Sequence, residues 1–233
     1  MERRICAVVG AGLGNGLALA RRFAADDYSV ALIGRSRDKL EQLVAEVPGA
    51  RVVPADAADP ASLTHAFRTI RDEMGPVDVL LYNAGSGQWG NFQEITAEGL
   101  EAGWRVNVLG LMVAGQAVVG DMIERSAGAI VVTGATASLR GNSGTAAFAS
   151  AKAGQRTLAQ SMAKHLGPQG VHVSYVVVDG VISTPATRER MGDKPDAFFL
   201  EPEQIAEAVH FLAHQQRSAW TFELDLRPFG ERW

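Results

Sequence analysis

The chain has 233 residues, 47% of them hydrophobic and 21% charged, which is typical of a soluble globular protein with a sizeable core. Its formal net charge is −4 and it has no block of basic residues, so its charge argues against nucleic acid or an anionic membrane as a partner. Cys6 is the only cysteine, which excludes a disulfide framework and favours a cytoplasmic location.

Apolar runs alternate with helical patterns along the whole chain. The runs predict buried parallel strands at 5–10, 29–34, 50–56, 77–85, 128–135 and 171–180, with a last short strand near 220–228. Helical patterns lie at 17–26, 37–47, 60–74, about 98–125 and 147–167. Asp59 before Pro60 has the pattern of a helix N-cap, and Gly167-Pro168 predicts a helix end. The order predicts an α/β fold, a doubly wound parallel sheet in one domain over 1–233, with its ligand site at the carboxyl ends of the strands.

A glycine-rich turn joins the first predicted strand to the first helix. Its sequence is Gly10-Ala11-Gly12-Leu13-Gly14-Asn15-Gly16. Glycines at 10, 14 and 16 allow a sharp turn and a close approach of the backbone to a pyrophosphate, whose charge is stabilised by the N–H groups at the helix N-terminus. Because the turn follows a strand and precedes a helix, it predicts a dinucleotide site.

Several motifs together resemble the short-chain dehydrogenase/reductase family over essentially the whole chain. They are Gly10-x3-Gly14-x-Gly16, Asn83-Ala84-Gly85, Asn107 and Lys152. The resemblance implies a Rossmann fold with about seven parallel strands, a homodimer or homotetramer, and a small-molecule substrate. It also implies cofactor contacts at Gly10, Leu13, Gly14, Asn15, Gly16, Arg35, Ser36, Asp56, Ala57, Asn83, Ala84, Gly85, Lys152, Ile182 and Thr184.

The chain departs from the family pattern at the catalytic positions. Ala135 occupies the place of the family's serine, and Phe148 occupies that of its tyrosine, four residues before Lys152. Val9 replaces a threonine, and Asp179-Gly180 replaces a Pro-Gly pair. The catalytic residues that remain are Lys152, which in the family holds the nicotinamide ribose, and Asn107, which there orders a water chain to the lysine.

The loss of the tyrosine leaves the proton donor open. Thr136, next to the lost serine, is the best replacement for polarising a carbonyl; Thr133, Ser138, Ser143 and Ser150 are nearby in sequence, and Tyr82 is a weaker candidate. A cationic imine would need no proton donor. We therefore predict a reductase of a small, apolar carbonyl or imine, with a catalytically silent NADP(H)-binding sensor or scaffold as the alternative.

The end of the second predicted strand bears on the choice of cofactor. NAD-binding sites of this type carry an acidic residue there, whereas this chain has Gly34-Arg35-Ser36-Arg37. A guanidinium binds a 2′-phosphate through two donors, so NADP(H) is favoured over NAD(H). One of the two arginines is expected only to open the next helix. No metal site is predicted, because the five histidines show no metal-binding spacing with acidic residues and the residues between His210 and His214 include no acid.

The rest of the sequence bears on the substrate and on assembly. Residues 183–200 match the segment that closes over the substrate in the family, and Phe198-Phe199 would either line this lid or dock a helix. Gln88, Trp89 and Phe92 are candidates for lining the same pocket. Helices near 99–123 and 148–167 are apolar enough to predict an oligomer. No signal peptide is expected, since the glycine-rich turn begins at Gly10, before a cleavage site could form. No membrane span is expected either, since the apolar stretches are far shorter than the roughly 20 residues that a span needs.

Overall fold

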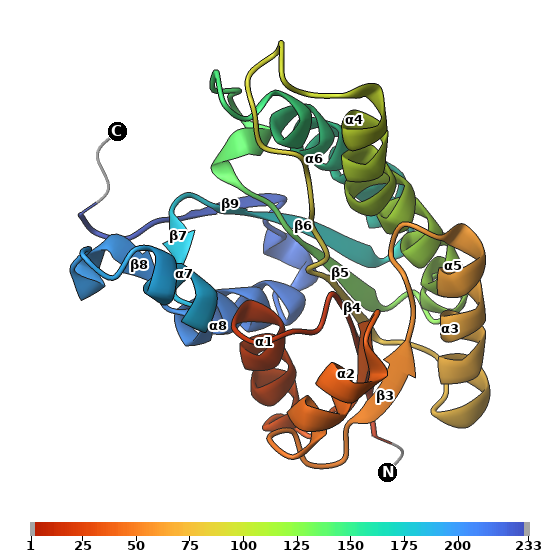
Figure 1. The fold of residues 1–233 in the computed structure, drawn as a ribbon. Coiled ribbons are helices and arrows are strands. Elements are labelled where there is room, and N and C mark those ends of the chain that lie inside the picture. Colours follow the sequence, from red (N-terminus) through yellow and green to blue (C-terminus); the bar gives the residue numbers. More distant parts are fainter. Residues whose placement is uncertain (1–2, 231–233) are drawn as a thin grey trace.

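A sheet of seven parallel strands organises the chain, which a computed structural model describes over residues 3–230 (Figure 1). Its strands are β1 (Ile5–Val9), β2 (Ser29–Gly34), β3 (Arg51–Pro54), β4 (Val79–Tyr82), β5 (Gly128–Thr133), β6 (Val171–Val178) and β9 (Glu223–Leu226). Their spatial order is β3-β2-β1-β4-β5-β6-β9. The order reverses between β1 and β4, so the carboxyl ends of these two strands form the switch point at which such sheets bind ligands. The predicted fold class is confirmed.

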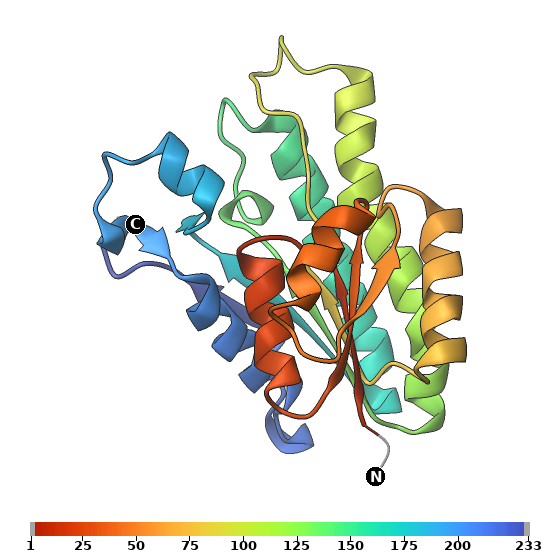
Figure 2. The ribbon, with the colours of Figure 1, turned by 60° about the horizontal axis from the view of Figure 1, so that its bottom comes forward.

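Helices cover both faces of this sheet (Figures 1 and 2). One face carries α1 (Asn15–Ala24), α2 (Arg37–Val44) and α8 (Pro202–Ala213), and the other carries α3 (Pro60–Glu73), α5 (Gly110–Glu124) and α6 (Ala146–Leu166). Because successive side chains on a strand point to opposite faces, β1 contributes Ala7 and Val9 to one core and Cys6 and Val8 to the other. The strands are therefore continuous apolar runs, the pattern by which they were predicted.

The ends of the elements follow their local chemistry. The Asp59 side chain accepts a hydrogen bond from the Ala61 amide and so caps α3, as predicted. Helix α6 ends at Leu166, directly before Gly167-Pro168. The strand predicted at 77–85 is shorter, because Asn83 and the two residues after it leave the sheet and form part of the ligand edge.

The long helix predicted at about 98–125 is interrupted. It consists of α4 (Ala97–Trp104), a π-helical turn (Arg105–Leu109) and α5. The stretch 97–124 includes an 18-residue window with a mean hydropathy of 1.6, so by length and composition it could cross a membrane, contrary to the expectation that every apolar stretch is much shorter than about 20 residues. It packs against α3 and α6 in this fold, as a core helix does.

The predicted lid is a folded segment. It contains α7 (Pro185–Arg190) and β8 (Phe199–Leu200), and β8 pairs in parallel with β7 (Val181–Ile182). Phe199 is buried, and the Arg188 guanidinium lies 4.0 Å from the centre of its ring. Arg188 also pairs with Asp196 and Glu201. These contacts favour the docking role for Phe199, while closure of the segment over a substrate stays a prediction.

Candidate functional site

The glycine-rich turn lies at the switch point of the sheet. Gly10 has a φ of +86°, and a Cβ at this position would lie 2.5 Å from the amide nitrogen of Ala84, so only glycine fits. Gly14, with a φ of +95°, is the N-cap of α1, and no side chain of the described residues caps that helix. The N–H groups of its first turn are therefore available to an anion such as a phosphate.

Two asparagines fix this turn. The Asn83 side-chain amide donates to the Gly10 carbonyl at 3.0 Å, and the Asn15 amide donates to the Asn83 side-chain oxygen at 2.6 Å. The Asn15 Oδ1 atom is buried and has no hydrogen-bond partner among residues 3–230. Because a buried polar atom without a partner is costly, Asn15 Oδ1 is suited to a ligand group that enters beside Gly10.

A cavity of about 700 Å³ extends from this turn over the ends of β2 and β3. Arg35 and Ser36 line it, whereas Arg37 begins α2 and pairs with Glu41 in solvent. The sequence left open which arginine merely opens the helix, and the structure assigns that place to Arg37. Asp56 also lines the cavity, where its Oδ1 atom accepts the Ala58 amide at 2.9 Å.

A second cavity, of about 330 Å³, lies on the other side of the turn and shares Gly10, Leu13, Asn83 and Gly85 with the first. Ala135, Phe148 and Lys152 line it. Of the predicted cofactor contacts, every one except Gly14 lines one of the two cavities. The chain thus brings residues from all three thirds of its length together in one cleft.

Lys152 is buried in this cleft. Its Nζ atom donates to the Thr133 carbonyl at 3.0 Å and to Gln155 Oε1 at 2.9 Å. Burial lowers the pKa of Lys152 to about 7, because the desolvated ammonium is less stable than in water. The amine therefore titrates near neutral pH.

Asn107 lies in the π-helical turn and is fully buried. Its amide donates to the carbonyls of Ser86 and Gly103 at 2.6 and 2.7 Å, which turns Oδ1 inward without a partner. A Cβ on Gly85 would lie 3.4 Å from this oxygen and 3.1 Å from Lys152 Nζ. The two side chains therefore face the same small space beside Gly85. π-Helical turns of this kind often occur at functional sites.

Gln155 was missed from the sequence. It is fully buried, three residues after Lys152 on the same face of α6, and its Nε2 atom has no partner among the described residues. The spacing from Lys152 was the available signal, but a polar residue within an amphipathic helix is usually placed in solvent.

The candidate hydroxyl groups lie outside the second cavity, with the exception of Thr133. Thr136 donates its hydroxyl to the buried carboxylate of Asp179. Tyr82 is wholly in the core, where it donates to the Val106 carbonyl and burial raises its pKa. The structure does not support Tyr82 as a proton donor in the cleft, and Thr136 is already engaged.

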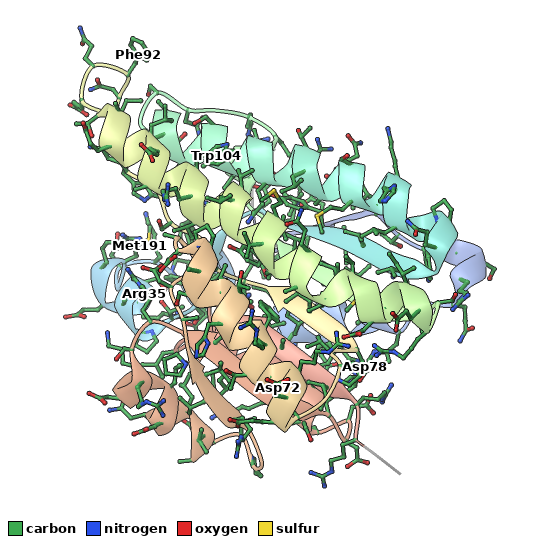
Figure 3. All side chains as sticks on the ribbon, turned by 90° about the vertical axis from the view of Figure 1, so that its right-hand side faces the viewer. Arg35, Asp72, Asp78, Phe92, Trp104 and Met191 are labelled. Atoms are coloured by element: carbon green, nitrogen blue, oxygen red, sulfur yellow. The ribbon has the colours of Figure 1, made fainter. Side chains whose placement is uncertain are left out.

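Aromatic side chains flank the cleft at Phe148. The Trp89 ring stacks on that of Phe148, with 5.1 Å between the ring centres. Gln88 instead accepts the Thr96 amide, and Phe92 is exposed at the tip of its loop (Figure 3). Of the three candidates for lining the pocket, only Trp89 therefore contacts a residue of the cavity.

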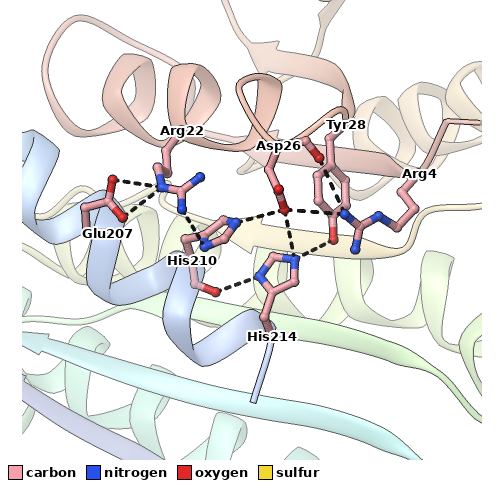
Figure 4. Close-up of polar contacts among 7 residues, drawn as sticks. All are labelled: Arg4, Arg22, Asp26, Tyr28, Glu207, His210 and His214. Carbon is pink, nitrogen blue, oxygen red and sulfur yellow. Dashed lines mark hydrogen bonds and ion pairs between the residues drawn. The ribbon is translucent and has the colours of Figure 1, made fainter. Parts of the chain in front are cut away.

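A polar cluster far from this cleft joins α1 to α8 (Figure 4). Asp26, His210 and His214 place ligand-type atoms within 4.8 Å of one another, a grouping that sequence spacing does not indicate. Arg4 pairs with Asp26 at 3.4 Å, and Arg22 contacts His210 at 3.0 Å and pairs with Glu207 at 2.8 Å. These contacts form an ion-pair network between α1 and α8.

Comparisons with known proteins agree with this geometry. The family described as short chain dehydrogenase matches residues 4–195. Carbonyl reductase family member 4 of Xenopus laevis is 28% identical over 214 residues, which cover 90% of each chain. A short-chain dehydrogenase from Rhodopseudomonas palustris superposes with a TM-score of 0.82 at 35% identity, over 97% of this chain and 99% of the other. An alcohol dehydrogenase from Thermococcus sibiricus, solved with 5-hydroxy-NADP, superposes with a TM-score of 0.87 at 27% identity over 98% of each chain.

Proposed function

Because the chain belongs to the short-chain dehydrogenase family of oxidoreductases, we propose that it uses NADP(H) to reduce a small, apolar carbonyl or imine substrate. The observation that carries this proposal is the cleft formed by the two cavities, which has Arg35 at one end and Lys152 at the other. A nicotinamide nucleotide supplies a hydride when bound.

The residues of the cleft fit a dinucleotide. The cradle at Gly10 and the uncapped start of α1 suit the pyrophosphate, and the buried Asn15 Oδ1 lacks a partner that a ligand would provide. Arg35 and Lys39 line the adjoining cavity and are both exposed, so they would bind a 2′-phosphate. Lys152 would lie beside the nicotinamide ribose.

The other wall of the cleft favours an apolar substrate. Phe148 presents a ring without a hydroxyl group, and Trp89 extends the aromatic surface. Ala135 and Ile182 add further apolar surface to the cavity. A bulky ionic substrate would lose its hydration here, and the lining offers it no ionisable side chain other than Lys152, which already donates to two acceptors.

Titration with NADPH and NADH, followed by nucleotide fluorescence, tests the cofactor assignment. We expect tighter binding of NADPH, and we expect Arg35→Ser to weaken NADPH binding by roughly tenfold, about 1.4 kcal/mol, while leaving NADH unchanged. Arg37→Ser is the matched control, because Arg37 pairs with Glu41 outside the cavity. Equal effects of the two substitutions would contradict the role of Arg35.

Consumption of NADPH in the presence of small ketones and cyclic imines tests the reaction. Turnover of an apolar member of either class supports a reductase. Tight NADPH binding without turnover of any of them would favour the alternative of a silent sensor or scaffold, for which the absence of the serine and tyrosine hydroxyls at Ala135 and Phe148 is the supporting observation.

A further inference from the structure

Lys152 is the only ionisable side chain among the described residues that line the cavity beside Phe148. The other polar side chains of that lining are asparagine amides and threonine hydroxyls, neither of which releases a proton near neutral pH. Ala135 and Phe148, which stand where the family has its serine and tyrosine, carry no ionisable proton. A substrate oxygen in this cavity therefore faces a single candidate acid.

We propose that the Lys152 ammonium is itself the acid that protonates the substrate, a role that rests on the reductase function proposed above. Two of its three N–H groups are held by the Thr133 carbonyl and Gln155 Oε1. The third is left for the cavity. Gly85 and Lys152 line the same cavity, and a Cβ on Gly85 would crowd the nitrogen at 3.1 Å, so the glycine keeps a side chain away from Nζ on that side.

The surroundings of Lys152 allow it to act near neutral pH. Burial is the cause of its lowered pKa of about 7, and no neighbouring charge contributes. Tyr175 on β6 contacts the Lys152 backbone carbonyl at 3.4 Å, and burial raises the Tyr175 pKa to about 12, so it stays neutral. An acid whose pKa lies near the working pH is the most effective donor.

Several charged groups on the elements around α6 have partners of their own. The pairs are Arg105 with Glu101, Arg156 with Glu223, and Asp179 with Thr136, Arg140 and Arg227. His172 on β6 stacks on Trp220, and burial lowers its pKa. None of these groups lines the cavity.

The proton balance of the step is simple. As the carbonyl carbon gains a hydride, the C=O π pair becomes an O–H bond and one N–H bond of Lys152 breaks. The ammonium is left as a neutral amine, and a water molecule restores its proton. Asn107 Oδ1 has no partner and faces the same space beside Gly85, so it would hold that water.

An NMR titration of the lysine side chains in the nucleotide-free protein tests the acid directly. The chain has only four lysines, and Lys39, Lys164 and Lys194 are exposed. We expect one lysine signal to titrate near pH 7 and to be absent from Lys152→Met. If no signal titrates near pH 7, or if such a signal persists in Lys152→Met, the proposal is overturned.

Two substrates separate proton donation from positioning of the nucleotide. A ketone needs a proton, whereas an N-alkylated cyclic iminium ion needs none. Lys152→Met should lose ~10²–10⁴ in rate on the ketone and far less on the iminium ion. Lys152→Arg, which keeps a cation but does not release a proton, should show the same difference.

The possible failures are distinguishable. Equal losses on both substrates would make Lys152 a positioning residue and overturn the acid role alone. Absence of turnover by the wild-type protein on either substrate would overturn the reductase function, and the acid role with it.

Discussion

At position 148 the side chain differs from that of the family pattern by a single oxygen atom, since phenylalanine stands in place of tyrosine. A tyrosine there would lie four residues before Lys152 on one face of α6, and the nearby ammonium would lower the pKa of its phenol. We expect Phe148→Tyr combined with Ala135→Ser to raise ketone reduction by at least tenfold, and by up to ~10². The rate should also persist to higher pH, because donation no longer depends on Lys152 alone. The pH profile of kcat measures both effects.

A matched control for this double variant is Phe148→Leu. It removes the ring that stacks on Trp89 without adding a hydroxyl. A comparable gain in the control would show that relief of crowding, and not proton donation, explains the change.

Gln155 is a hydrogen-bond partner of the Lys152 ammonium and is therefore expected to affect the pKa of Lys152. Its Oε1 atom accepts from the ammonium, and such a bond favours the charged form. Gln155→Met should therefore lower the pKa of Lys152 by about one unit, since a hydrogen bond to a charged group contributes roughly 1.5–3 kcal/mol. Gln155→Glu should raise it, because a carboxylate is a stronger partner.

The same lysine NMR titration measures these opposite shifts. Shifts of the same sign in the two variants would contradict the assigned contact. The experiment does not depend on turnover, so it bears on the structure of the site even in the absence of a known substrate.

At the scale of elements, the polar cluster of Asp26, His210 and His214 forms a seam between α1 and α8. We expect this seam to make the free energy of unfolding depend on pH. Burial lowers the pKa of His210 below 6.5, with the nearby His214 and Arg22 adding to the effect and the bond to Asp26 opposing it. The unfolded chain then binds more protons than the folded one below pH 6.5, so the free energy of unfolding falls as the pH falls from about 7 to 5. The Asp26 pKa is also lowered, chiefly by the bond from His210, but that contribution is lost only below 3.8.

Urea unfolding at pH 7 and pH 5 measures how much His210 contributes to the pH dependence of the free energy of unfolding. We expect the wild-type protein to lose more stability over this interval than His210→Gln, by less than about 1 kcal/mol. His65→Gln, at an exposed position on α3, is the control and should behave as the wild type does. An unchanged pH dependence in His210→Gln would exclude the seam as the source.

Features that depend on neighbouring residues could be predicted from the sequence, whereas contacts between distant residues could not. Strands, the glycine-rich turn and the cap at Asp59 depend on neighbouring residues, so their patterns predicted them. The contact of Asp26 with His210 joins residues 184 positions apart, and no local pattern contains it. The π-helical turn at Asn107 includes Val106, whose carbonyl accepts a hydrogen bond from Tyr82, 24 residues earlier, and no local pattern contains this contact either. For the same reason Arg35 and Arg37 could be distinguished only once α2 was placed.

At the scale of the whole molecule, the apolar helical stretch 97–124 has a face that the rest of the chain leaves exposed. An 18-residue window within it has a mean hydropathy of 1.6, yet only 44% of that window is buried within one chain. Leu100, Trp104 and Met112 are exposed on this helix. A second copy of the chain packed on this face would remove that apolar surface from water, and a stable contact needs about 800 Å² from each partner.

We therefore expect the protein in solution to have at least twice the chain mass of 24.8 kDa, as measured by light scattering after gel filtration. Trp104→Glu places a charge on the apolar face and should weaken self-association by roughly 30-fold or more, about 2 kcal/mol. Asp72→Lys alters the charge on α3, at a site well separated from Trp104 in Figure 3, and should leave the mass unchanged. A monomeric wild-type protein that floats with lipid vesicles would contradict self-association and assign the apolar face to a membrane. A monomer that stays in solution would leave this face exposed and would refute both self-association and membrane binding.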